Sequence, residues 1–165
     1  MECCNNIVLI GMPGCGKTSL GSIIAERLEL DFYDIDQYIE KKENKKIAEI
    51  FLLGEPHFRK IESAAIREVS CKKSVVIATG GGAVTRAENI VELQQQGTIF
   101  YIERSLEKII GSTDMSARPL LADNVKRIYT LYEQRKHLYE TQCHHQITNN
   151  QSLESAADQI LEKIG

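Results

Sequence analysis

The segment GMPGCGKTS, from Gly11 to Ser19, has the residue types and the spacing of a phosphate-binding loop. It matches the pattern G-x-x-x-x-G-K-[ST], and it lies between a short apolar run and a helical pattern, as the motif requires. Its glycines let backbone amides approach phosphate oxygens, Lys17 can reach the β- and γ-phosphates, and the Thr18 hydroxyl can bind magnesium. We therefore predict an ATP or GTP site formed by Gly14, Cys15, Gly16, Lys17, Thr18 and Ser19.

Two aspartates, Asp34 and Asp36, stand one residue apart just after another apolar run. In isolation they are typical of a loop residue and a helix cap. Beside a phosphate loop, one carboxylate can serve magnesium and the other can take the proton of an acceptor hydroxyl, which is worth roughly 10² to 10⁴ in rate. Because residues i and i+2 of an extended segment project to the same side, we expect both to face the cleft while Ile35 packs inward.

A GTPase switch is the main alternative use of such a loop, and its other motifs decide between the two classes. Neither an Asn-Lys-x-Asp guanine reader nor an Asp-x-x-Gly switch segment occurs in the sequence. The nearest string, Asn44 to Ile47, lacks the aspartate. A kinase for a small molecule is therefore favoured.

Composition limits the possible partners. A chain of 165 residues that is 42% hydrophobic suits one globular domain with an ordinary core. Its 20 basic and 23 acidic residues form no basic block suited to nucleic acid or an anionic membrane. No apolar run approaches the roughly 20 residues of a membrane span. We expect a cytoplasmic monomer without nucleic-acid or membrane partners.

The cysteines are odd in number and irregularly spaced, so they indicate reduced thiols rather than a disulfide framework or a zinc ribbon. They are Cys3, Cys4, Cys15, Cys71 and Cys143. The run Cys143 to His145 contains metal-ligand residue types, but neighbours on a strand point to opposite faces, so we expect no metal there. Cys15 is either a reactive thiol in the positive potential of the loop amides or a small residue that the loop tolerates.

Apolar strand-like runs alternate with helical patterns along the chain, which predicts an α/β fold. The runs are Ile7 to Gly11, Asp31 to Ile35, Ser74 to Ala78, Thr98 to Ile102 and His145 to Thr148. Because they are continuously apolar, we expect a mostly parallel sheet that is covered on both faces and binds ligands at the carboxyl ends of its strands.

Four further motifs follow in order, after the phosphate loop and the Asp-x-Asp pair. They are GEPHFRKIE (Gly54 to Glu62), TGGGAV (Thr79 to Val84), SARPLL (Ser116 to Leu121) and EQRKHLY (Glu133 to Tyr139). As an ordered set, spanning Ile7 to about Thr148, they resemble the shikimate kinase family.

The resemblance implies a three-layer P-loop NTPase fold of the nucleoside monophosphate kinase type, with a five-stranded parallel sheet flanked by helices. It implies a single domain over residues 1–165, with the phosphate loop at 11–18, a substrate-binding segment at about 34–62 and a lid at about 111–123. The implied reaction is phosphorylation of the 3-hydroxyl of shikimate by ATP, on the route to chorismate and the aromatic amino acids.

Shikimate is a small carboxylate with three hydroxyls, so its site needs fixed cations and hydrogen-bond partners. The resemblance assigns the carboxylate to Arg59 and Arg135, whose guanidinium forks suit planar bidentate recognition. It also implies that Asp36 contacts the reacting hydroxyl. It also places Phe51 and Phe58 along the substrate ring, although core packing explains these phenylalanines as well.

The glycine run Gly80, Gly81 and Gly82 follows a strand, and its bare amides can approach a ligand closely. A tight turn from strand to helix is the plainer explanation of the run. The resemblance also places Asp34, with Thr79, on the magnesium side together with Thr18. It brings Arg118 of the lid over the transferring phosphate, where a cation stabilises developing charge.

The sequence departs from the family at two places. Family members often have an arginine against the adenine ring near Ile110 and Gly111, and this chain has none. Either Lys108 substitutes for it or ATP is held more weakly. Asn44 stands where a turn glycine is usual, which is tolerable because asparagine adopts left-handed backbone angles comparatively easily.

Two rival functions remain at this point. A kinase for another polyol acid, such as gluconate, keeps the phosphate loop but has less use for Arg59 and Arg135. A catalytically silent relative would bind without transferring, and the presence of Lys17, Asp36 and Arg118 argues against it.

Overall fold

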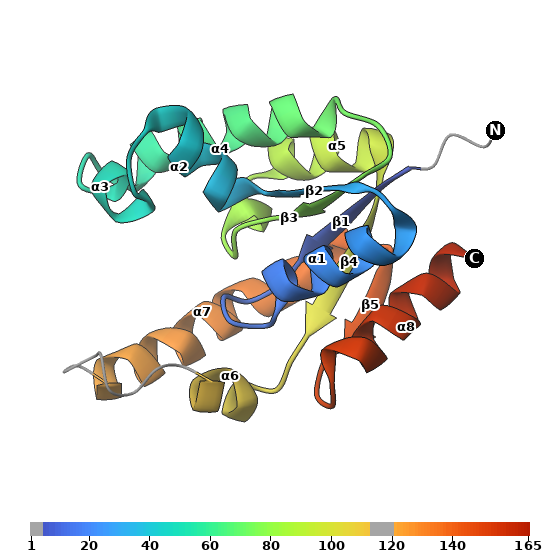
Figure 1. Ribbon diagram of the computed structural model, residues 1–165. Coiled ribbons are helices and arrows are strands. Elements are labelled where there is room, and N and C mark those ends of the chain that lie inside the picture. Colours follow the sequence, from blue (N-terminus) through green and yellow to red (C-terminus); the bar gives the residue numbers. More distant parts are fainter. Residues whose placement is uncertain (1–4, 113–120) are drawn as a thin grey trace.

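Five strands form one sheet in the computed structural model of the chain, which describes residues 5–112 and 121–165. They are β1 (Asn6–Ile10), β2 (Asp31–Asp34), β3 (Val75–Ala78), β4 (Gly97–Glu103) and β5 (His145–Thr148). Their order is β2-β3-β1-β4-β5, and every neighbouring pair is parallel (Figure 1). The predicted parallel sheet is confirmed, and each strand lies within one residue of its predicted bounds.

Helices cover both faces of this sheet (Figure 1). They are α1 (Lys17–Leu28), α2 (Ile35–Glu43), α3 (Ile47–Phe51), α4 (Glu55–Ser70), α5 (Ala87–Gln96), α6 (Leu106–Ser112), α7 (Leu121–Gln142) and α8 (Leu153–Ile164), with a short 3-10 turn, η1, at Ala83–Thr85. On one face α1 packs against α8, and on the other α5 and α7 contact β4. The three-layer α/β prediction is therefore confirmed.

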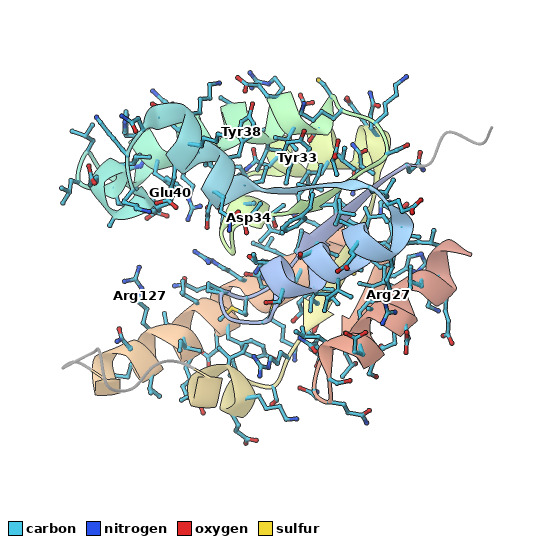
Figure 2. All side chains as sticks on the ribbon, viewed as in Figure 1. Arg27, Tyr33, Asp34, Tyr38, Glu40 and Arg127 are labelled. Carbon is cyan, nitrogen blue, oxygen red and sulfur yellow. The ribbon has the colours of Figure 1, made fainter. Side chains whose placement is uncertain are left out.

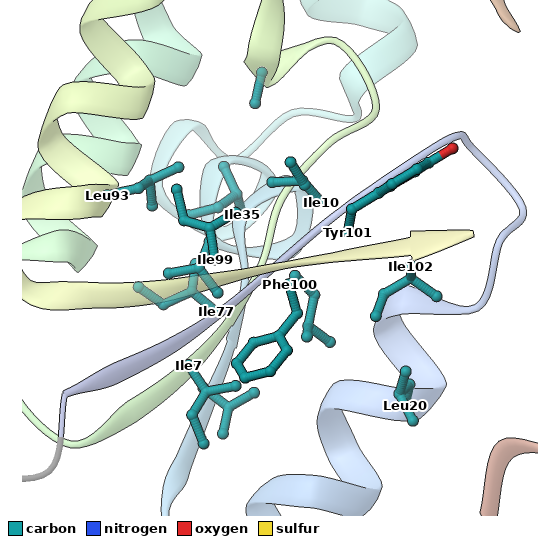
Figure 3. Close-up of a cluster of buried hydrophobic side chains, with 14 of the residues drawn as sticks. Ile7, Ile10, Leu20, Ile35, Ile77, Leu93, Ile99, Phe100, Tyr101 and Ile102 are labelled. Carbon is teal, nitrogen blue, oxygen red and sulfur yellow. The ribbon is translucent and has the colours of Figure 1, made fainter. Parts of the chain in front are cut away.

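The core lies on both sides of the central strands, because their apolar residues are continuous rather than alternating. All five residues of β1 are buried. In β4, side chains alternate between the two faces, so Ile99 and Phe100 point to opposite sides of the sheet (Figure 3). Leu20 of α1 packs on one side of the sheet and Leu93 of α5 packs on the other, and both are fully buried (Figure 3).

Local capping explains where two of the helices end or begin. Asn44 ends α2 in the left-handed conformation, with φ at 52°, so the expected tolerance of asparagine at this turn is confirmed. Ser152 begins α8, and its hydroxyl accepts a hydrogen bond from the amide of Ser155 at 3.1 Å. This bond satisfies one of the free amides of the first turn and so fixes where α8 begins.

His144, in the run of potential metal-ligand residues, has a structural use. Its Nδ1 atom accepts a hydrogen bond from the Ile99 amide at 2.8 Å, and its own amide donates to the Ile99 carbonyl at 2.8 Å. His144 therefore connects the residue before β5 to the start of β4.

Within residues 5–112 and 121–165, no helix is long and apolar enough to span a bilayer.

Candidate active site

The phosphate loop leaves the buried end of β1 and turns directly into α1. Gly14 and Gly16 have φ angles of 83° and 99°, which favour glycine strongly. A Cβ atom on Gly16 would lie 2.7 Å from the side-chain amide of Asn149, and that amide donates to the Cys15 carbonyl at 2.8 Å. The turn before α8 therefore braces the loop and leaves no room for a side chain at position 16.

Lys17 lies inside the curve of this loop and is 8% exposed. Its ammonium donates to the Gly11 and Met12 carbonyls at 2.7 and 2.9 Å, and it lies 3.6 Å from the Cys15 sulfur. Cys15 is 1% exposed, which favours its packing role over reactivity, because a buried thiol is poorly accessible to reagents.

The predicted geometry of the aspartate pair is wrong in one respect. Asp34 is the last residue of β2 and caps α2, so the chain is already helical at Asp36 and the two carboxylates do not share one face of a strand. The carboxylate of Asp34, not that of Asp36, makes the cap hydrogen bond, with the Gln37 amide at 3.0 Å. Ile35 between them is fully buried, as predicted.

The helical turn sends the two carboxylates to different neighbours. The second oxygen of Asp34 accepts a hydrogen bond from the Thr18 hydroxyl at 2.6 Å, which joins the end of β2 to the phosphate loop. Figure 2 shows Asp34 where β2 meets α2. Asp36 instead lines a cavity beside the glycine run. Thr18 and Asp34, which are both predicted on the magnesium side, are therefore in direct contact.

A cavity of about 330 Å³ brings the predicted acceptor residues together. All eight line it, namely Asp36, Phe51, Phe58, Arg59, Gly80, Gly81, Gly82 and Arg135. Pro13 of the phosphate loop lies on its wall, so the cavity opens beside the position predicted for ATP phosphates. This is the place where an acceptor must lie for direct phosphoryl transfer.

Arg59 is fixed in this cavity by its neighbours on α4. Its Nη1 donates to Glu62 at 2.8 Å, and its Nε and Nη2 donate to one oxygen of Glu55 at 3.4 and 3.2 Å. A Cβ on Gly82 would lie 2.3 to 2.6 Å from three guanidinium atoms, so only a bare backbone fits against this cation. The plane of Arg59 is thus set before any ligand contacts it.

Sequence reasoning missed Glu55 and Glu62, although both stand in a motif that it singled out. Their separations from Arg59, four and three residues along a helix, are those of contacting side chains and were the available signal. Glu62 is 1% exposed, and burial raises the pKa of its carboxyl in spite of the neighbouring Arg59.

Asp36 lies close to this buried acid. A Cβ on Gly80 would lie 3.0 Å from a Glu62 oxygen and 3.3 Å from an Asp36 oxygen, so both carboxylates border the same bare glycine. Burial, then repulsion from Asp34 and Glu62, raises the pKa of Asp36 to about 6. The site therefore holds a carboxyl that is close to its titration point near neutral pH.

The two phenylalanines differ in burial but lie against each other. Phe58 is 3% exposed and belongs to the core, while Phe51 is 38% exposed. Their rings stack at 4.3 Å between centroids, and both line the cavity. Phe58 thus connects the core to the acceptor side.

A second cavity, of about 220 Å³, lies where the phosphate loop enters α1. Gly16 and Ser19 contribute to it, together with Arg104, Lys108 and the turn at 149–153. Arg104 donates to the Gly14 carbonyl at 3.1 Å, and Lys108 hydrogen-bonds the Asn150 carbonyl. Sequence reasoning considered Lys108 but not Arg104.

The predicted lid is only partly described. Helices α6 and α7 extend into it from both ends, over residues 111–112 and 121–123, and Arg118 lies outside the described residues. Arg127 of α7, which sequence reasoning missed, lines the acceptor cavity and extends from the helix into the space below α2 and α3 (Figure 2).

Comparison with known proteins places the chain in a family. The family model described as shikimate kinase matches residues 13–165. The chain belongs to the shikimate kinase family. A shikimate kinase of Clostridium botulinum (strain Alaska E43 / Type E3) is 44% identical over 160 residues, covering 97% of this chain and 94% of that protein. A shikimate kinase of Clostridium beijerinckii is 41% identical over 160 residues, covering 97% and 95%.

Solved shikimate kinases agree with this fold. The structure from Acinetobacter baumannii, in complex with shikimate, has a TM-score of 0.90 and 36% identity, covering 98% of this chain and 93% of that chain. The structure from Aquifex aeolicus has a TM-score of 0.82 and 31% identity, covering 96% and 95%. A gluconokinase from Sinorhizobium meliloti, at 16% identity and a TM-score of 0.64, shares only the fold.

The raised pKa of Asp36 predicts how its removal changes stability. The folded protein binds the Asp36 proton more tightly than the unfolded chain, so ionisation of Asp36 opposes folding above about pH 6 and has no effect below about pH 4. Asp36→Asn should therefore increase the free energy of unfolding by about 1 to 3 kcal/mol at pH 8. The gain should shrink as the pH falls towards 4, as measured by urea denaturation.

Asp31→Asn removes an exposed carboxylate from β2, the strand that leads into α2, and serves as the control. It should give no comparable gain at pH 8. Equal stability of Asp36→Asn and the native protein at pH 8 would contradict the burial cost.

Proposed function

We propose that the chain transfers the γ-phosphoryl group of ATP to the 3-hydroxyl of shikimate, giving shikimate 3-phosphate and ADP. The observation that carries this proposal is the acceptor cavity, where a fixed Arg59, Arg135 and a titratable Asp36 border the phosphate loop. The shikimate complex of the A. baumannii relative supports the same acceptor. We also propose that residues 1–165 act as one domain, as a monomer in the cytoplasm.

Arg59 and Arg135 are proposed to bind the substrate carboxylate. They reach the cavity from different helices, α4 and α7, so a carboxylate between them is fixed in orientation as well as position. Glu55 and Glu62 take three of the donor contacts of Arg59, and a guanidinium has five N–H donors. Two donors thus remain for a planar carboxylate.

Asp36 is proposed to act on the reacting hydroxyl. Its pKa of about 6 leaves it largely ionised at neutral pH, yet basic enough to accept a proton as the new bond forms. The hydroxyl oxygen attacks the γ-phosphorus, its proton passes to Asp36, and the bond from the γ-phosphorus to the bridging oxygen breaks with its electron pair leaving on ADP. The cavity position beside Pro13 is compatible with this in-line approach.

Lys17 and the loop amides are proposed to hold the phosphates, with Gly14, Cys15, Gly16, Thr18 and Ser19 forming the cradle. The Lys17 ammonium already lies within the loop, where it can turn from backbone carbonyls to phosphate oxygens. For Arg118 we retain the proposed role of a cation over the transferring phosphate.

The residues present fit a magnesium ion. Thr18 and Asp34 place a hydroxyl and a carboxylate 2.6 Å apart at the start of α1, and Mg²⁺ commonly takes one or two such protein ligands plus phosphates and water. We propose that these two residues hold the ion, with Thr79 nearby through water. Bound magnesium supplies charge that neutralises the β- and γ-phosphate oxygens.

The second cavity is proposed to receive adenine. It adjoins Gly16 and Ser19, whereas the acceptor cavity adjoins Pro13, so the two ends of the nucleotide can point to opposite sides of the loop. Arg104 offers a planar cation there, which can stack on a purine. We propose that Arg104 replaces the adenine-facing arginine that the chain lacks near Gly111.

The first prediction of the proposal concerns the acceptor. In a coupled assay of ADP release, shikimate should be phosphorylated far faster than quinate or gluconate. Lys17→Ala and Asp36→Asn should each abolish turnover while the circular dichroism spectrum stays native, because both act on charge at the transfer site. Preference for gluconate would favour the rival kinase, and shikimate binding without ADP release would favour a silent relative.

The carboxylate clamp makes a second prediction. Arg135→Ala should raise the shikimate dissociation constant roughly tenfold to a hundredfold, since a charge-assisted hydrogen bond is worth about 1.5 to 3 kcal/mol. ATP affinity should barely change. A shikimate analogue with its carboxylate reduced to an alcohol should bind poorly to the native protein and lose little more in the variant.

Calorimetry should measure the binding of shikimate and of the alcohol analogue to the native protein and to Arg135→Ala, which gives a double-difference cycle. Arg59 is best tested as Arg59→Lys, because removing the cation entirely would leave Glu62 buried without its partner. Equal weakening of acid and alcohol would show that the arginines do not recognise the carboxylate.

The adenine site makes a third prediction. Arg104→Ala should raise the dissociation constant of ATP about three- to fivefold, as expected for loss of a partly exposed cation–π contact. Binding of inorganic tripolyphosphate should be unchanged, because it has no base. Arg67→Ala, an exposed arginine of α4, is the control. Equal losses for both ligands would mean that Arg104 supports only the phosphate loop through Gly14.

A further inference from the structure

The geometry points to Tyr139 of α7 as a positioning residue that holds both Arg135 and the Gly81 carbonyl in place for the acceptor. This inference rests on the proposed function, since it assigns a role within the same acceptor cavity. Tyr139 itself is absent from the cavity lining. It acts on the substrate only through residues that the cavity does contain.

The hydroxyl of Tyr139 donates to the Gly81 carbonyl at 2.6 Å. Arg135 stands one helical turn earlier on α7, so the two side chains lie on the same face of the helix, and the Arg135 charge partly offsets the rise that burial causes in the pKa of Tyr139. A tyrosine hydroxyl has one donor and can also accept, so it can hold the Arg135 guanidinium while it donates to Gly81. The oxygen thus lies between a proposed carboxylate ligand and the glycine run.

The rest of the side chain is held rigidly. Tyr139 is fully buried, and its ring stacks on Tyr101 at 5.2 Å between centroids with 17° between the planes. A phenylalanine would fill the same space and keep this stacking. The polar contacts therefore require a reason beyond core packing, since burying a hydroxyl is unfavourable unless it is hydrogen-bonded.

The link continues to the nucleotide side. A Cβ on Gly81 would lie 2.7 Å from the Pro13 ring, so the glycine run packs directly on the phosphate loop. The Tyr139 hydroxyl also lies 3.9 Å from the sulfur of Met12 in that loop. A carbonyl fixed by Tyr139 therefore fixes the distance between the acceptor wall and the phosphates.

Tyr139→Phe in the full chain tests this role. The dissociation constant of shikimate should rise roughly three- to tenfold, the effect of one lost hydrogen bond, while that of ATP changes less than about twofold. In a cycle with Arg135→Ala, the two losses should not add, because Tyr139 is inferred to act through Arg135. Calorimetry should measure the shikimate dissociation constant of the native protein, of both single variants and of the double variant.

Tyr101→Phe is the matched control, since it removes a hydroxyl from the other ring of the same stack. It should leave shikimate affinity unchanged. Native shikimate affinity in Tyr139→Phe, additive losses with Arg135→Ala, or equal losses for ATP and shikimate would each overturn the inference, the last by indicating a purely structural role.

Amide hydrogen exchange separates this inference from the proposed function. The segment 80–85 should exchange faster in Tyr139→Phe than in Tyr101→Phe, since only the first loses the anchor at Gly81. This readout needs no substrate. Failure of the native protein to bind shikimate would refute the proposed function alone, whereas unchanged exchange in Tyr139→Phe would refute the anchoring role of its hydroxyl.

Discussion

The guanidinium of Arg59 must remain charged and in one orientation while almost wholly removed from water. Two carboxylates at helical spacing satisfy part of its donors, and the ring of Phe58 lies 5.3 Å from its central carbon. A guanidinium held in this way leaves no room for a side chain at the neighbouring backbone. Gly82 occupies that position, where a Cβ atom would collide with the guanidinium. The burial of Glu62 and the bare glycine run are therefore consequences of one fixed cation.

Burial and neighbouring charge set the ionisation of Asp36. The loss of solvent, followed by electrostatic repulsion from two acids, makes its ionised form unfavourable, and a base with a raised pKa is what the proposed proton transfer near neutral pH requires. Asp34 instead accepts hydrogen bonds from the Thr18 hydroxyl and the Gln37 amide. The two aspartates thus differ in their surroundings, although they stand only two residues apart.

The fold and most of the proposed site residues could be predicted because their signals are local. Strand bounds follow from apolar runs, and the cavity lining follows from an ordered set of motifs. The error over Asp36 arose because periodicity cannot show where a strand ends and a helix begins; the cap made by Asp34 decides that. Arg104 escaped notice, and Tyr139 was noted only as the end of a motif, because their contacts lie with Gly14 and Gly81, remote in sequence, and nothing local in the chain indicates such pairs.

The strand order also constrains how the molecule is made. β1 is the first strand to be synthesised, yet it is the central one, and its two partners begin at Val75 and Gly97. Closing such long loops before any pairing is gained slows folding, and the unpaired apolar strand is prone to aggregate meanwhile. Asn149, which braces the phosphate loop, is made later still. A nascent chain therefore carries a complete nucleotide motif long before it can form the braced shape of that loop.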